Sequence, residues 1–371
     1  MKALAAGLTF FARRLLQAAL VMLAILIIAF AVRSALGDPL REIMGEAVPE
    51  AERAKLMHEL GLDAPWPVQL ARYLDGAVKG DLGTSFIYKR PTLEIVLAKF
   101  PASFELVLGA SLIVLLFSLP AGIYGAVRPR ALGARLVLGL SVLGISIPVF
   151  LTGILLITIF SVWLGWLPAF GRGETIRLGF WETGVLTRSG LEHLLLPALT
   201  LSSIMLPLFI RLVRGAMLDE LGHDYVRTAR AKGASPPRVW LNHVLRNALL
   251  PLAAVGGLQI GTLVAYTLLT ETVFQWPGMG FLFLEAVTRA DIPLITTYLV
   301  FVGLLFVVTN TLVDIVSLML DPRISLEGRR LSPQPCAPVR APSSHSPPSG
   351  RARQSPASSS ASSRWRPFSR R

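Results

Sequence analysis

The sequence predicts an all-α membrane protein with six transmembrane helices and with both termini in the cytoplasm. Three observations lead to this prediction: the apolar composition, six long apolar segments and the distribution of Lys and Arg among the loops. Of the 371 residues, 53% are hydrophobic and only 16% are charged, and the mean hydropathy of +0.59 is too high for an ordinary soluble domain. We therefore expect a chain embedded in a lipid bilayer.

Six segments are long enough to cross the membrane, because a helix that rises 1.5 Å per residue needs about 20 mostly apolar residues to do so. They are residues 15–32, 103–127, 136–164, 194–212, 252–274 and 293–320. The first follows Arg13 and Arg14 and could also be a cleaved signal peptide. Its apolar run exceeds the usual length of about 7–15 residues in signal peptides, so we interpret it as a retained span.

The positions of Lys and Arg set the orientation, because these residues remain preferentially in cytoplasmic loops. An amino terminus inside the cell places residues 128–135, the basic segment after Arg211 and the carboxy-terminal tail on the cytoplasmic side. The long loop of residues 33–102 is then outside. There we expect two short amphipathic helices and a turn at residues 80–83. The sequence leaves open whether this loop only covers helix ends or contacts a partner.

The expected organisation has three parts. Residues 1–102 contain the first span and the outer loop, residues 103–324 form a five-helix core, and residues 325–371 form a tail rich in Ser, Pro and Arg, which is expected to be disordered. The tail holds much of the formal net charge of +13, so the basic composition does not indicate nucleic-acid binding. The single cysteine, Cys336, excludes a disulfide and a Cys-based metal site within one chain.

The cytoplasmic loop of residues 215–250 contains the most informative pattern, HDYVRTARAKGASPPRVWLNHVLRNALLP at residues 223–251. It predicts a helix that ends at Gly233, because glycine readily adopts the left-handed conformation found at helix ends. Ser235 is a candidate N-cap for a second helix, with Pro236 at its first position. The sequence therefore predicts a helix-turn-helix pair at the inner face of the membrane.

Three roles are conceivable for this helix pair. A loop tethered at both ends near a bilayer is poorly placed to enter a DNA major groove. Attraction to anionic lipid explains the positive charge but not the turn. The small residues Ala229, Ala231 and Gly233 favour the third role, in which the first helix docks in a groove of a cytoplasmic protein and flanking arginines steer it.

The run RTARAKG, from Arg227 to Gly233, resembles the conserved cytoplasmic loop of ABC-importer permeases, in particular those of the dipeptide, oligopeptide and nickel transport group. Arg227 stands where the general consensus has an acid, and the consensus proline is delayed to Pro251, but the peptide-type variant fits almost throughout. The resemblance covers roughly residues 7–324. It includes the stretches GDLGTSF, SIPVFLTGILLITIFSVWLGWLPAFG, LPALTLSS, TETVFQWPGMG and NTLVDIVSLMLDPRI.

This resemblance implies a type I ABC importer permease fold and a role as the permease subunit of an ATP-driven, binding-protein-dependent peptide importer in the bacterial inner membrane. The implied partners are a second homologous permease subunit, two cytoplasmic ATPase subunits, an extracytoplasmic solute-binding protein and membrane lipid. The loop of residues 224–250 would couple the permease to the ATPase. The implied coupling helix consists of Tyr225, Arg227, Thr228, Ala229, Arg230, Ala231, Lys232 and Gly233.

The chain contains no GxxxxGK[ST] phosphate-binding loop. We therefore expect that it is not an enzyme, that it binds no cofactor and that the partner subunits use the ATP. A self-sufficient secondary transporter or channel is the alternative function, but that class is expected to show internal repeats, and none is evident. An intramembrane protease is less compatible still, because a second carboxylate well inside the spans is missing.

Polar residues inside the fifth span are candidates for the translocation path. Gln259, Thr262 and Tyr266 form a stripe beside Gly257 and Gly261, which suits either close helix packing or the wall of a path. Glu271 closes this span. It is interpreted either as an outer gate or binding-protein contact, or as an interfacial acid left in water.

Asn310 and Asp314 lie four residues apart on one face of the sixth span. An ionisable side chain at mid-span costs about 2.5–3.5 kcal/mol on insertion scales, so Asp314 needs a partner. We expect interhelical hydrogen bonding or a pair with a loop arginine at these two positions, not substrate contact.

Overall fold

The computed structural model describes residues 2–36 and 64–320, which are almost entirely helical. The helices of both described ranges belong to one compact unit. The expected tail and the first of the two expected outer-loop helices lie outside the described residues.

Five helices in the described part of the chain are long and apolar enough to cross a membrane. They are α1 (Lys2–Leu36), α5 (Thr92–Val127), α8 (Arg188–Leu221), α11 (Leu245–Phe274) and α13 (Ile292–Leu320). Each contains one of the expected spans and extends beyond it at one or both ends. The boundary expected at residue 102 lies inside α5, so the outer part of α5 is continuous with the core.

The third expected span, residues 136–164, is divided. It consists of α6 (Leu132–Ser146), α7 (Val149–Leu156) and the π-helical segment η1 (Ile157–Trp163). Ile147 between the first two has an extended backbone with φ −92° and ψ 123°, because the ring of Pro148 disfavours the helical conformation of the residue before it. The expectation of one continuous helix here is corrected to a helix divided at this proline.

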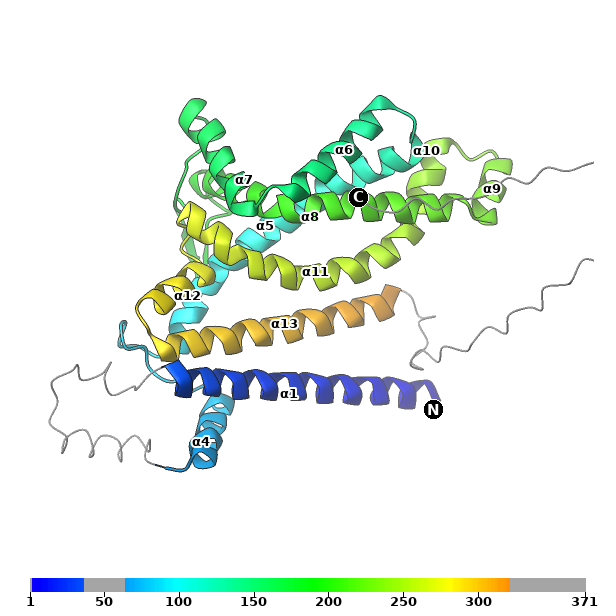
Figure 1. The fold of residues 1–371 in the computed structure, drawn as a ribbon. Helices are drawn as coiled ribbons and strands as arrows, with labels where there is room; N and C mark the ends of the chain where they lie inside the picture. Colours follow the sequence, from blue (N-terminus) through cyan, green and yellow to red (C-terminus); the bar gives the residue numbers. More distant parts are fainter. Residues whose placement is uncertain (1, 37–63, 321–371) are drawn as a thin grey trace, which may run out of the picture. The chain divides into compact units, whose positions relative to one another are not determined.

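The long helices pack side by side (Figure 1): α5 against α8, α8 against α11, and α13 between α11 and α1. Buried Leu106, Leu201 and Met205 belong to the apolar cluster between α5 and α8. Because α1 and α13 run in opposite directions, the first residues of α1 and the last residues of α13 lie at the same end of the helices. The predicted helix pair after α8 lies at that end too, which agrees with the expected orientation.

The other end carries shorter elements that cover the helix ends. α4 (Trp66–Val78) packs against α1, with ring centroids of Phe30 and Trp66 5.1 Å apart. The strands β1 (Ile176–Leu178) and β2 (Trp181–Thr183) form an antiparallel hairpin. α12 (Met279–Thr288) begins within the QWPGMG stretch of residues 275–280 and was not expected from the sequence.

The expected turn at residues 80–83 is confirmed. Gly80 and Gly83 both have positive φ angles, +81° and +98°, which favour glycine. This turn leads the chain from α4 toward the start of α5.

Candidate functional site

The predicted helix pair begins where α8 ends. α9 (Asp224–Ala231) is followed by a turn, by α10 (Pro236–Arg238) and by the π-helical segment η2 (Val239–Val244), which continues into α11. Asp224 in the first turn of α9 and Arg230 in its last turn both complement the helix dipole. The expected helix-turn-helix is confirmed, and its second helix runs directly into the fifth span.

The turn between the helices depends on Gly233, whose φ of +79° is in the left-handed region. Its N–H donates to the Arg230 carbonyl at 3.0 Å, and the Ala234 N–H donates to the Ala229 carbonyl at 3.2 Å. A Cβ atom added to Gly233 would meet no other atom within 4 Å, so glycine is required for its backbone conformation and not for space. Ser235 occupies the N-cap position, but its side chain makes no capping bond.

One face of α9 is anchored in an apolar cluster. Val226 is only 1% exposed and belongs to a cluster with Met217 of α8 and with Val239 and Val244 of η2. Full burial of a side chain of this size contributes about 1.5–3 kcal/mol. α9 is therefore fixed to the ends of both α8 and α11.

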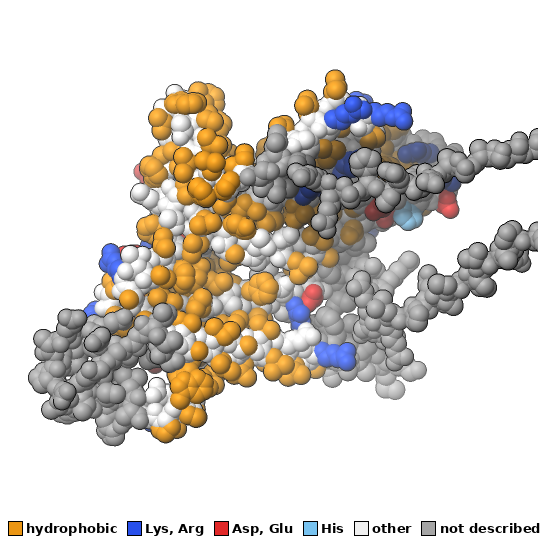
Figure 2. Space-filling view, in the orientation of Figure 1, with side chains coloured by type: hydrophobic (Ala, Val, Ile, Leu, Met, Phe, Trp, Pro, Cys, Tyr) orange, Lys and Arg blue, Asp and Glu red, His pale blue; other side chains and the backbone are white. Residues whose placement is uncertain are grey.

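The other side of α9 is open to solvent. Of the eight expected docking residues, Tyr225 and Ala229 are half-buried, and the rest are exposed: Arg227, Thr228, Arg230, Ala231, Lys232 and Gly233. Figure 2 shows mostly hydrophobic side chains along the middle of the helices, with Lys and Arg gathered toward the end where α9 lies. The exposed face of α9 is thus basic, with small residues at its carboxy-terminal end.

Tyr225 links α9 to its neighbours through polar contacts. Its hydroxyl donates to the carboxylate of Glu220 in α8 at 2.6 Å. Burial raises the pKa of Tyr225, and the hydrogen bond to Glu220 raises this pKa further, while a hydrogen bond with Asn247 of α11 acts in the opposite direction. This tyrosine therefore stays protonated at neutral pH and connects α8, α9 and α11.

The polar stripe of α11 and the two glycines near it in the sequence lie on different faces of this helix. The Thr262 hydroxyl donates to the Gln259 side-chain oxygen at 2.9 Å, and Tyr266 is 38% exposed. Gly257 and Gly261 instead face α13, where added Cβ atoms would overlap with side chains of that helix. The glycines therefore permit close packing of α11 on α13, and the polar stripe is a separate feature.

Glu271 lies apart from that stripe. At 100° per residue it is on the opposite face of α11 from Thr262 and Tyr266. Its side chain is fully buried, and it accepts hydrogen bonds from the Ser103 hydroxyl at 2.5 Å and from the Phe281 N–H at 2.9 Å. The interpretation of Glu271 as an acid left in water is wrong, because α5 and α12 cover it.

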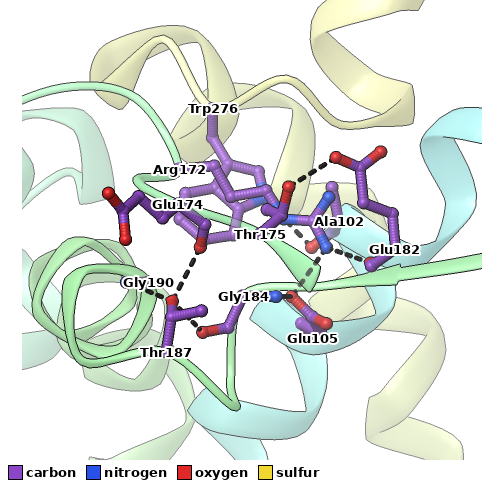
Figure 3. A network of polar contacts seen from close by, with 10 residues as sticks. All are labelled: Ala102, Glu105, Arg172, Glu174, Thr175, Glu182, Gly184, Thr187, Gly190 and Trp276. Atoms are coloured by element: carbon purple, nitrogen blue, oxygen red, sulfur yellow. Dashed lines mark hydrogen bonds and ion pairs between the residues drawn. The ribbon is translucent and has the colours of Figure 1, made fainter. Parts of the chain in front are cut away.

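A buried ion pair that was not expected from the sequence fixes the hairpin to α5 (Figure 3). Arg172 donates to the Glu105 carboxylate at 2.8 Å and to the Glu182 carbonyl at 2.6 Å. The side chains of Arg172 and Glu105 are 8% and 5% exposed. Trp276 lies next to this network, and its indole N–H donates to the Ala102 carbonyl at 3.0 Å. Glu105 lies near the outer end of its span. This position was the one feature of the sequence that could have predicted the ion pair.

The GDLGTSF stretch is held by a third buried carboxylate, that of Asp291. Asp291, at the start of α13, is fully buried and accepts hydrogen bonds from the Ser85 hydroxyl and from the N–H groups of Phe86 and Ile87. The N–H of Thr92 donates to the Gly83 carbonyl at 3.0 Å. This segment of the outer loop is therefore a fixed part of the extracytoplasmic end.

The two polar residues of the sixth span make different contacts. Asn310 donates to the Phe306 carbonyl of its own helix at 2.8 Å. Asp314 forms an ion pair with Arg14 of α1 at 2.7 Å. The structure thus brings Asp314, but not Asn310, into an interhelical pair.

Known protein families and individual relatives match most of this chain. Residues 118–326 match the family model described as binding-protein-dependent transport system inner membrane component, and residues 7–107 match the model of its N-terminal part. The chain is 39% identical over 331 residues to the di/tripeptide transport system permease protein DppB of Pseudomonas aeruginosa, covering 85% of this chain and 98% of that relative. It is 37% identical over 314 residues to the oligopeptide transport system permease protein AppB of Bacillus subtilis, covering 84% and 98%.

Among solved structures, the chain is similar to the MetNI methionine ABC transporter in an inward-facing conformation. The TM-score is 0.46 at 19% identity, and the match covers 59% of this chain and 94% of that chain. The family models together span most of the described residues, and the relatives align over nearly their full length. The chain belongs to the family of binding-protein-dependent transport system inner membrane components, the permease subunits of bacterial ABC importers.

Proposed function

We propose that this chain is the permease subunit of an ATP-driven peptide importer, and that residues 224–250 couple it to a cytoplasmic ATPase. Dipeptide and oligopeptide permeases are the relatives that it matches over nearly their whole length, which supports a peptide substrate. The observation that carries the coupling role is the arrangement of α9, which exposes a basic face and anchors its opposite face in the protein. The alternative of a self-sufficient transporter leaves this exposed helix without a function.

The anchoring of α9 supports a direct mechanical connection. Val226 packs against both α8 and η2, and Tyr225 bonds to Glu220 of α8. A partner that shifts α9 therefore shifts the inner ends of the fourth and fifth spans with it. Such a displacement is the kind of motion that converts an outward-open path into an inward-open one.

The remaining components of the importer follow from this role. ATP is bound and hydrolysed by two partner ATPase subunits, and this chain binds no cofactor itself, which the missing phosphate-binding loop supports. A second, homologous permease completes the path, and an extracytoplasmic binding protein delivers the peptide. In this chain the wall of the path includes Gln259, Thr262 and Tyr266, because they form a polar stripe on α11.

Site-specific cross-linking tests the coupling role. Ala231 is replaced by cysteine in a Cys336→Ser background, and the full chain is co-expressed with the ATPase subunits of peptide importers from the same cell. We expect cross-links from position 231 to an ATPase, with a yield that changes when ATP is trapped. A Phe180→Cys variant is the control, because Phe180 is 90% exposed but lies on the hairpin at the other end. Equal yields from both positions, or none from position 231, would refute the coupling role.

A further inference from the structure

A groove opens between α1, α11 and α13 at a place that the transport role does not explain. Its volume is about 230 Å³. Its polar lining includes Arg14, Gln17 and Asp314, and its apolar lining includes Val21, Leu258 and Phe306. The Arg14 guanidinium and the Asp314 carboxylate are 2.7 Å apart, and their side chains are 26% and 42% exposed. Both charges are therefore accessible from the groove.

The groove has the polarity profile of a lipid. Arg14 lies near the beginning of the apolar segment Ala12–Val32, and Asp314 lies near the end of Ile292–Ile315, so the ion pair is at the border of the hydrocarbon layer. Val21 is about 10 Å deeper along α1 and Phe306 about 12 Å deeper along α13, at a rise of 1.5 Å per residue. The lining thus changes from charged to apolar over the depth that a headgroup and the first part of an acyl chain occupy.

We propose that this groove binds an aminophospholipid of the cytoplasmic leaflet, with phosphatidylethanolamine as the fitting chemistry. The phosphate accepts hydrogen bonds from the Arg14 guanidinium, and the primary ammonium donates to the Asp314 carboxylate. A headgroup with both charges side by side replaces the internal ion pair without leaving either side chain unpaired. One acyl chain then lies against Val21, Leu258 and Phe306.

Other occupants fit these groups less well. The headgroup of phosphatidylglycerol has no cation for Asp314, so its binding brings two negative charges together. The choline headgroup carries a cation but no N–H donor for the carboxylate. Asp314 is therefore the residue that selects the ammonium, and Arg14 is the residue that holds the phosphate of any phospholipid.

Native mass spectrometry tests this proposal. The full chain is reconstituted in nanodiscs with equal parts of phosphatidylethanolamine, phosphatidylcholine and phosphatidylglycerol and then released in mild detergent, and the retained lipids are identified. We expect phosphatidylethanolamine to be enriched about tenfold over the other two, the effect of one charge-assisted hydrogen bond. Asp314→Asn is expected to remove this preference, Asp314→Glu to keep it, and Arg14→Gln to lower retention of all three lipids.

A matched control comes from the opposite end of the helices. Glu285 pairs with Arg289 at 3.0 Å, and Glu285→Gln removes this pair without changing the groove, so lipid preference should not change. Equal retention of the three lipids by the unmodified chain would overturn the proposal, and so would a preference that survives in Asp314→Asn. Displacement of the bound lipid by a peptide would also overturn it, because the groove would then belong to the transport path. Lipid retention is measured without ATP or transport, so the result is independent of the coupling role.

Discussion

Different kinds of contact stabilise the extracytoplasmic and the cytoplasmic ends of the long helices. At the extracytoplasmic end, three buried carboxylates connect elements that are far apart in the sequence: Glu105 bonds to Arg172, Glu271 to Ser103, and Asp291 to Ser85. At the cytoplasmic end, α9 is held mainly by apolar packing around Val226 and by the bonds of Tyr225.

This difference has a mechanical meaning. Buried hydrogen bonds to carboxyl groups require one geometry and are costly to break, so they keep the outer elements in a fixed arrangement. Apolar packing is non-directional and tolerates small rotations of one helix on another. The outer end is therefore suited to present a constant surface, and the inner end is suited to transmit movement.

The largest effect is expected from breaking the outer ion pair. Arg172→Met leaves the Glu105 carboxylate buried without its partner, which costs about 3–5 kcal/mol. The free energy of unfolding of the full chain in detergent, measured by denaturant titration, is expected to fall by this amount.

The double variant Glu105→Leu/Arg172→Met is the control. Both charges are then absent, and in the structure Glu105 Oε1 and Arg172 Nε already lack hydrogen-bond partners among the described residues. We expect the double variant to recover most of the lost stability, because replacement of a buried pair by apolar groups is often neutral. A double variant as unstable as Arg172→Met would show that the unpaired Glu105 carboxylate is not the cause of the lost stability.

The second prediction concerns the turn of the inner helix pair. Gly233→Val forces a β-branched residue into the left-handed region, at a local cost of about 1–2 kcal/mol. We expect membrane insertion to be unchanged and peptide-dependent ATP turnover of the assembled importer to be largely lost. Gly215→Val is the matched control, because an added Cβ at Gly215 also meets no atom within 4 Å but its φ angle is not positive. Equal turnover in the two variants would contradict the role of the turn.

A smaller effect is expected at Tyr225. Tyr225→Phe removes the hydrogen bond to Glu220 and keeps the ring, so stability should fall by about 0.5–1.5 kcal/mol. Glu220→Gln keeps a hydrogen-bond acceptor and should cost less. We expect peptide-dependent ATP turnover to be highest in the unmodified chain, lower in Glu220→Gln and lowest in Tyr225→Phe. A higher turnover in Tyr225→Phe than in Glu220→Gln would contradict a role of this hydrogen bond in coupling.

The inner end was the more predictable from sequence because its signals are local. Gly233 and Pro236 mark a turn and a helix start over a few residues, and both elements are present. Long apolar runs predicted six spans. Five of them are continuous helices, whereas Pro148 divides the third expected span, residues 136–164. Signals of this kind depend only on neighbouring residues.

The outer end could not be predicted in this way because its contacts are distant in the sequence. Glu271 and Ser103 are 168 residues apart, and Asp291 and Ser85 are 206 apart. Glu271 has the same local sequence whether it faces water or a neighbouring helix, so only the packing of α5 and α12 decides its burial. The expected roles of α9 and of the α11 stripe remain predictions for the same reason, since they concern partners outside this chain.

The smallest predicted effect is a pH dependence at the outer end. Burial, together with the hydrogen bond to Glu285, raises the pKa of Tyr88 from 10.0 to about 12, because both favour the protonated phenol. The folded chain therefore holds this proton more tightly than the unfolded chain. The contribution of Tyr88 to stability is fully present below pH 10 and is lost as the pH rises toward about 12. Tyr88 is 38% exposed, so the effect should be small. Thermal unfolding of the unmodified chain and of Tyr88→Phe should differ by a constant amount up to pH 10 and converge above it, whereas a constant difference throughout would mean that Tyr88 titrates as it does in water.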